Sequence, residues 1–152
     1  MAVGSSIWQC QALEGSLVDC ILIGNKLQRD SPPEIVEAMY LKFQKMTLGS
    51  LTKEVSALTD IPEGMKERLR KLTIERNWLA HRSWADILPH ANSQSTEILY
   101  KFLDRINNAA DEALALHKEF EKIVEQRVIN SGVTKEFIDK TTEEIYSRWL
   151  AG

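Results

Sequence analysis

Three side chains near the middle of the chain could together carry out acid–base chemistry at a phosphate. Arg76, Asn77 and His81 stand in the run ERNWLAH, residues 75–81. A histidine suits proton transfer because its unperturbed pKa is about 6.5. An arginine suits a phosphate because its planar fork can bind two oxygens and keeps its charge. We therefore assign His81 as general acid/base, Arg76 as phosphate clamp, and Asn77 as the residue that orients His81 or a phosphate oxygen.

Cleavage of RNA is one reaction that such a set of side chains could promote without a metal. The ribose 2′-OH of RNA is a built-in nucleophile, so cleavage needs removal of that proton, stabilisation of charge at phosphorus and protonation of the leaving 5′-oxygen. A histidine and an arginine can supply all three. The expected products carry a 2′,3′-cyclic phosphate on one side of the cut and a 5′-OH on the other.

No competing constellation of metal or cofactor ligands is present in the sequence. His81, His90 and His117 are not at ligand spacing, and the chain has no HExxH, paired CxxC, Gly-rich phosphate loop or G-x-S-x-G. Cys10 and Cys20 stand about 15 Å apart along one predicted helix, which is too far for a disulfide. We expect buried free thiols, a hydrogen-bonded core position for His117, and no metal or cofactor.

Apolar residues recur at three- and four-residue steps along most of the chain, and no segment alternates as a β-strand would. The pattern predicts one all-α domain over residues 1–152, an antiparallel helical bundle of four long helices plus a short extra helix. The helical pattern is found in six segments, one more than that count, which cover residues 6–29, 32–46, 50–58, 61–88, 96–128 and 134–150. Ser31 and Asp60 are predicted to cap the second and the fourth of these helices.

The helix predicted over residues 61–88 carries the three candidate residues and has two apolar stripes on opposite sides. The stripes consist of Leu69, Leu72, Arg76, Leu79 and Ser83, and of Ile74, Trp78, His81, Ala85 and Leu88. One stripe can face the core, whereas the other needs another helix or another copy of the chain. Because Arg76 and His81 are about 140° apart around the axis, their convergence needs a kink or a second copy.

The run ERNWLAH resembles the signature of the HEPN superfamily, an arginine followed by a polar residue and, after a short spacer, a histidine. Residues 46–51, MTLGSL, are also similar to a segment that precedes this motif in some bacterial members. The resemblance implies an all-α fold, a homodimer with the two motifs facing one cleft, and a metal-independent endoribonuclease. It also implies a role as a toxin or defence effector, with RNA as substrate and an antitoxin protein as a further partner.

One position departs from a branch of that superfamily. Members partnered by nucleotidyltransferase antitoxins have a tyrosine two residues after the histidine, where this chain has Ser83. Regulation by nucleotide transfer to that tyrosine is therefore not expected. Two alternatives stay open: a catalytically inactive HEPN-like module that binds a partner protein or a nucleotide, and a plain helical bundle with an accidental motif. Burial of Arg76 against a carboxylate of its own chain would favour the plain bundle.

The charge and hydropathy of the chain bear on its partners. A net charge of −3 argues against tight binding to nucleic acid of any sequence, although residues 61–90 carry six basic and four acidic side chains. No Lys or Arg precedes Lys26, as a signal peptide would require, and no apolar stretch approaches the roughly 18 residues of a membrane span. We expect a cytoplasmic protein with no membrane partner.

Overall fold

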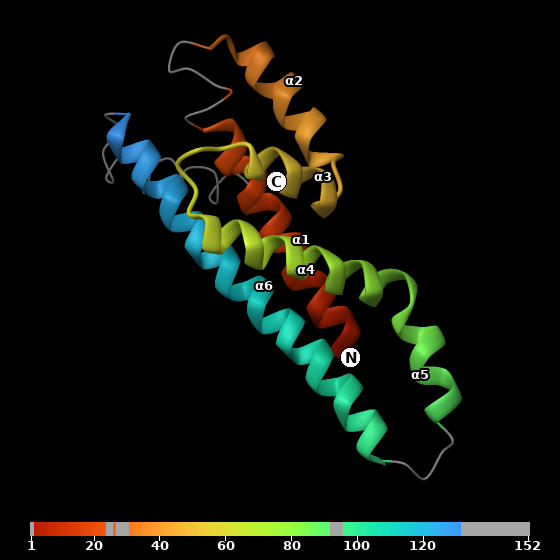
Figure 1. Cartoon of the computed structure of the whole chain (residues 1–152). Helices are drawn as coiled ribbons and strands as arrows, with labels where there is room; N and C mark the ends of the chain where they lie inside the picture. The colour runs from red at the N-terminus through yellow and green to blue at the C-terminus, as the bar shows by residue number, and fades with distance from the viewer. Residues whose placement is uncertain (1, 24–25, 27–30, 92–95, 132–152) are drawn as a thin grey trace, which may run out of the picture.

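The computed structural model describes residues 2–23, 26, 31–91 and 96–131, which contain six α-helices and no β-strand (Figure 1). In chain order the helices are α1 (Ala2–Leu22), α2 (Pro33–Gln44), α3 (Leu48–Ser56), α4 (Glu63–His81), α5 (Ser83–Ala91) and α6 (Thr96–Asn130). The prediction of an all-α helical bundle is confirmed. The helix predicted over residues 134–150 lies outside the described residues.

The long helices α1, α4 and α6 form the body of the bundle. In Figure 1, α1 and α6 rise toward the upper left, and α4 runs across them from left to right. Contacts fix the direction of α1 relative to α6, since Ser6 bonds to Ile106 and Ser16, later on α1, bonds to His117, later on α6. These two helices are therefore parallel. Figure 1 shows α4 crossing them in the opposite direction. Helices α2 and α3 lie at one end of this body and α5 lies at the other.

The core is built around α1. Its buried apolar side chains include Leu13, Leu17, Ile21 and Leu22. The facing stripe on α6 recurs at steps of three and four residues and consists of Ile106, Ala109, Ala113, Leu116 and Phe120. Small side chains at Ala109 and Ala113 allow close approach of the two helices, and Ser6 Oγ donates to the Ile106 carbonyl at 3.0 Å. None of the described helices is both long enough and apolar enough to cross a lipid bilayer.

The cap predicted for the second helix is wrong. The helix α2 begins at Pro33, and Pro32 rather than Ser31 occupies the N-cap, without a side-chain cap hydrogen bond. Pro32 has φ −58° and ψ 142°. The ring fixes this φ, and the proline that follows disfavours helical ψ. Two successive prolines thus move the start of the helix one residue beyond the predicted one.

Asp60 does not cap α4, contrary to the prediction, because Pro62 occupies that N-cap. The Asp60 carboxylate instead lies 2.5 Å from Nη2 of Arg127, near the end of α6. Arg127 also donates to the backbone carbonyls of Cys20 and Ile23. Carbonyls at the C-terminal end of a helix lack intrahelical partners and attract a cation. This one guanidinium therefore ties together the end of α1, the start of α4 and the end of α6.

The helix predicted over residues 61–88 is wrong as one continuous element. The chain bends at Arg82, whose φ and ψ are −127° and −23°, so that α4 ends at His81 and α5 begins at Ser83. The buried Ser83 hydroxyl donates to the Leu79 carbonyl at 2.7 Å. Back-bonding of this kind to the carbonyl four residues earlier often bends a helix. The predicted helix ends at residue 88, whereas α5 continues to Ala91 with Pro89 inside it.

The two cysteines are free and buried, as predicted. Burial is the largest cause that raises the pKa of the Cys10 and Cys20 thiols to about 11. Thiolates are the reactive form of cysteine, so both side chains act as small apolar core residues at neutral pH.

Truncation of the core tests the α1–α6 interface. Phe120 is fully buried, so Phe120→Ala removes a large contact and leaves a cavity, and we expect the free energy of unfolding to fall by about 3–5 kcal/mol. Leu103→Ala on the exposed side of the same helix should change it by only about 0.5 kcal/mol. Urea denaturation of both variants measures the difference, and equal losses would contradict this packing.

Candidate functional site

The three candidate residues lie in the last two turns of α4, immediately before the bend. Asn77 and His81 are exposed and, being four residues apart, lie next to each other on the outer side of the helix. Arg76 is half-buried and points toward α1. Among the described residues, no hydrogen bond or ion pair involves the side chain of Asn77 or His81. The structure thus brings these two residues together and holds Arg76 apart from them.

Arg76 has a carboxylate partner in its own chain. Its Nη2 lies 3.8 Å from Oε1 of Glu14 on α1, and the two side chains are 25% and 22% exposed. This separation is an ion pair but too long for a hydrogen bond, and the buried Oε1 of Glu14 has no hydrogen-bond partner among the described residues. A contact of this kind favours the plain-bundle interpretation of the motif, because it gives Arg76 a structural role.

The Glu14 carboxyl group lies where three influences on its pKa meet. Burial raises this pKa most strongly, while the Arg76 guanidinium and a hydrogen bond from the backbone N–H of Leu48 lower it. The net shift is upward, so removal from water outweighs both attractions. Leu48 is the first residue of α3, and Glu14 therefore lies between the N-terminal end of α3 and the motif arginine of α4.

The two predicted stripes of residues 61–88 have different surroundings. The first is buried as predicted and contributes Leu69, Leu72, Leu79 and Ser83 to the interior. The second is largely exposed, with Ile74 65% and Leu88 57% accessible, whereas Trp78 is buried. Trp84, four residues before Leu88 on α5, is 71% accessible. Large apolar side chains are thus exposed both before and after His81 in the chain.

Trp78 fixes the bend that follows the motif. Its Nε1 donates to Oδ2 of Asp86 on α5 at 2.7 Å, and its ring stacks on Phe102 of α6 with centroids 6.1 Å apart. The Arg105 guanidinium lies 3.8 Å from the ring centroid, and the same side chain donates to Glu75 at 2.6 Å. A tryptophan in van der Waals, cation–π and hydrogen-bond contact at once holds α4, α5 and α6 in one arrangement around the corner where His81 lies.

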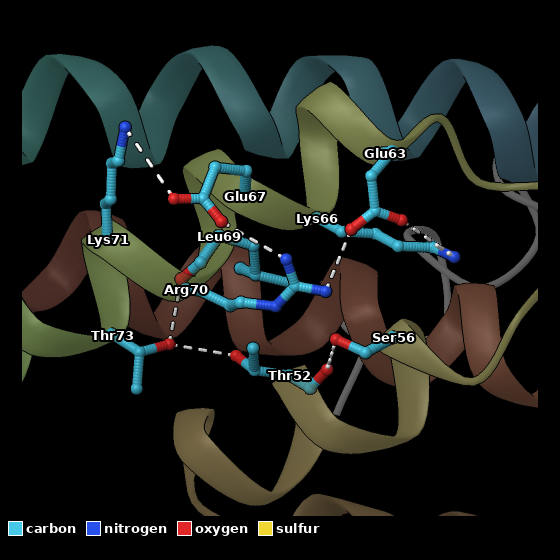
Figure 2. Close-up of polar contacts among 9 residues, drawn as sticks. All are labelled: Thr52, Ser56, Glu63, Lys66, Glu67, Leu69, Arg70, Lys71 and Thr73. Atoms are coloured by element: carbon cyan, nitrogen blue, oxygen red, sulfur yellow. Dashed lines mark hydrogen bonds and ion pairs between the residues drawn. The ribbon is translucent and has the colours of Figure 1, made fainter.

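A second set of polar contacts joins α3 to α4 on the side away from α6 (Figure 2). Thr52 Oγ1 and Thr73 Oγ1 are 2.9 Å apart, and each also lies within hydrogen-bond distance of a backbone carbonyl four residues earlier. Two hydroxyl protons can make only two of these three contacts full hydrogen bonds at once. Figure 2 also shows Arg70 held by Glu63 and Glu67. The Thr52–Thr73 contact holds α3 beside the helix that carries the motif, whereas the Arg70 ion pairs lie within α4.

The basic side chains of residues 61–90 are mostly neutralised within the chain. Those with an ion-pair partner are Lys66, Arg68, Arg70, Lys71 and Arg76. Arg82 is exposed and makes no ion pair with the described residues. Its place directly after His81 leaves one cation available for a phosphate beside the histidine. The remainder of this segment does not form a basic surface.

The other histidines take no part in this site. His117 is hydrogen-bonded, as predicted, with Nδ1 2.5 Å from Ser16 Oγ. It is half-buried rather than in the core, with its side chain 23% exposed and Nε2 3.5 Å from Glu121. His90 lies in α5 with its ring centroid 6.2 Å from that of Phe102. In the part of the chain that the structure describes, no three His, Cys, Asp or Glu side chains are grouped closely enough to hold a metal ion.

Sequence reasoning did not identify Glu14 as a neighbour of the motif. A signal was present, because Glu14 and Asp19 are the two acidic or basic side chains of the 21-residue helix α1. A charge on a mostly buried helix needs a partner from another element. Both find one, since Asp19 accepts a hydrogen bond from the Tyr40 hydroxyl and Glu14 pairs with Arg76.

Comparison with known proteins gives no independent indication of the family. The chain matches no protein-family model, and searches of curated proteins and of solved structures find no significant match to it. The resemblance to the HEPN superfamily therefore rests on the motif and its helical setting, and it stays a prediction.

Removal of one hydrogen bond tests the role of Trp78 at the bend. Trp78→Phe keeps most of the ring but leaves the Asp86 carboxylate without its indole donor, and we expect a loss of about 1–2 kcal/mol in the free energy of unfolding. Amide hydrogen exchange in α5 should accelerate as well. Trp84→Phe is the matched control, since that ring is exposed, and a similar loss in both variants would argue against the contact.

Proposed function

We propose that this protein is a metal-independent endoribonuclease of the HEPN type that acts as a toxin or defence effector. The observation that carries the proposal is the position of Asn77 and His81, adjacent and exposed at the end of α4, followed by Arg82, which makes no ion pair with the described residues. Since His81 has no hydrogen-bond or ion-pair partner among the described residues either, its imidazole can exchange protons with a substrate. Its position at a corner fixed by Trp78 gives it a defined place without burying it.

The proposed reaction uses the roles assigned to the motif. Neutral His81 accepts the proton of the ribose 2′-OH, the 2′-oxygen bonds to phosphorus, and the bond from phosphorus to the 5′-oxygen breaks. The leaving 5′-oxygen takes up a proton, supplied by an imidazolium. Arg76 binds the phosphate oxygens as negative charge develops, and Asn77 orients the imidazole. The products are a 2′,3′-cyclic phosphate and a 5′-OH.

The proposed active unit is a homodimer. Within one chain Arg76 faces α1 and His81 faces outward, so a phosphate cannot contact both in the arrangement observed. A second copy would bring its own motif to the same cleft, and one histidine could then act as base while the other acts as acid. The exposed side chains of Ile74, Trp84 and Leu88 are suited to burial between two copies.

The alternative function is a catalytically inactive module that binds a partner protein or a nucleotide. The acidic net charge of −3 favours it. The ion pair between Arg76 and Glu14 counts against catalysis, because it gives Arg76 a structural role that a plain helical bundle would also need. The neutralised basic side chains of α4 point the same way. Under this alternative the motif stabilises the bundle and the exposed surface around Trp84 binds the partner.

Cleavage of RNA in EDTA separates the two functions. We expect purified protein to release fragments with 2′,3′-cyclic phosphate ends, and His81→Ala to slow the reaction by at least about 100-fold, the contribution of a general acid or base. Arg76→Ala should also slow it, whereas Arg70→Ala, an arginine on the same helix but away from the motif, should not. DNA should remain intact because it lacks the 2′-OH. Equal cutting by all variants would show a contaminating nuclease and contradict the assignment.

Charge reversal at the exposed apolar side chains tests the dimer. We expect Trp84→Glu to convert the protein to a monomer in sedimentation velocity, because a carboxylate cannot be buried between two apolar surfaces without a partner. Leu41→Glu is the control, since Leu41 is 51% accessible on α2, at the other end of the molecule (Figure 1). A wild-type protein that is monomeric at all concentrations would contradict the proposed arrangement.

A further inference from the structure

Glu14 lies where a substrate phosphate would have to bind if Arg76 is to contact it. The carboxylate approaches the guanidinium to 3.8 Å from the side of α1. A carboxylate and a phosphate present the same kind of oxygen acceptors to an arginine. The chain's own side chain thus stands in for the anion that the motif is proposed to bind.

The contact between Glu14 and Arg76 is incomplete. At 3.8 Å it has no hydrogen bond, and Oε1 of Glu14 is buried without a hydrogen-bond partner among the described residues. An anion removed from water without full hydrogen bonding is costly, and the upward shift of the Glu14 pKa reflects that cost. The pair therefore holds Arg76 without a hydrogen bond between the two side chains, so a better-placed anion can replace Glu14.

The Glu14 side chain has room to leave. A pocket of about 300 Å³ lies beside it between α1 and the α2–α3 connection. Side chains that line this pocket include Gln11, Phe43, Gln44 and Met46. A rotation of Glu14 into this space would carry its carboxylate away from α4 and toward the polar amides of Gln11 and Gln44.

We propose that Glu14 is an autoinhibitory side chain that competes with an RNA phosphate for the Arg76 guanidinium. This inference rests on the proposed ribonuclease function and adds its regulation. The site binds RNA tightly only when Glu14 has turned away or has taken up a proton. An arginine that looks structural in the free protein then becomes a phosphate ligand in the complex.

The pH dependence of RNA binding follows from the groups that face Glu14. These are the Cys10 thiol on α1, the Arg76 guanidinium on α4 and the backbone N–H of Leu48 at the start of α3. Burial raises the pKa of the Cys10 thiol to about 11, so this thiol stays protonated on the acid side of neutrality, and Glu14 is the carboxyl group of the set. Because its pKa is raised, its negative charge disappears as the pH falls through that pKa, and the affinity for RNA should rise.

The test measures affinity rather than cleavage, in a His81→Ala background that leaves RNA uncut. The probe is a fluorescently labelled RNA oligonucleotide of mixed sequence, followed by anisotropy. We expect Glu14→Gln to lower Kd by about tenfold, since a charge-assisted hydrogen bond to Arg76 becomes available. Glu67→Gln makes the same change in net charge at a residue that pairs with Arg70 and Lys71 instead, and it should leave Kd nearly unchanged.

Three outcomes would overturn the proposal: no gain from Glu14→Gln, an equal gain from Glu67→Gln, or a gain that persists when Arg76→Ala is added. The protein with native Glu14 gives a second reading, because its affinity should rise at lower pH while that of Glu14→Gln changes less. Failure of the ribonuclease function is separate, since it would appear as no cleavage by the protein that retains His81. Even if the protein does not cleave RNA, Glu14→Gln could still strengthen RNA binding through Arg76.

Discussion

The whole bundle depends on covering α1. This helix has 21 residues, two acidic side chains and no basic ones, so it cannot present a broad solvated face. The other helices cover it, with α6 alongside in parallel, α4 crossing in the opposite direction, and α2 and α3 at one end (Figure 1). The two acids each receive a partner from another helix, and Arg127 of α6 covers its terminal carbonyls. Hydrophobic burial does not by itself select one orientation of the packed helices. These polar contacts select it, because each joins particular atoms of two helices.

The candidate site inherits its geometry from that packing. The rotation of α4 that buries Leu69, Leu72 and Leu79 also turns Arg76 toward α1. The same rotation leaves Asn77 and His81 exposed to solvent. The orientation of α4 about its own axis therefore places Arg76 at the edge of the core and the other two motif residues on the surface. Any function proposed for Arg76 must therefore account for Glu14, because the two side chains face each other at the boundary of the core.

Periodicity in the sequence was sufficient to predict the all-α class, the buried stripe of α4 and the buried cysteines. It could not predict the bend at Arg82, because a helical pattern continues through residues 83–88. The hydrogen bonds that accompany the bend, from Ser83 to the Leu79 carbonyl and from Trp78 to Asp86, leave no mark on that pattern. The Asp60 cap failed for a similar reason, since a residue far away in sequence, Arg127, takes that carboxylate. Arg76 could be recognised as a charge on an apolar stripe, but its partner became known only when α1 was placed beside α4. Spacing along one helix thus identifies unusual side chains, and tertiary contacts decide what those side chains do.

The parallel pairing of α1 with α6 has a consequence for synthesis of the protein. Ser6 and Ile106, which bond across this interface, are 100 residues apart. At about 5–20 residues per second, the ribosome completes this part of α6 roughly 5–20 s after the facing part of α1. During that interval α1, the most apolar of the described helices, lacks α6, the helix that packs along its length. The nascent chain is then a natural client for chaperones that bind exposed apolar segments, and a ribosome that stalls before α6 would leave a fragment prone to aggregation.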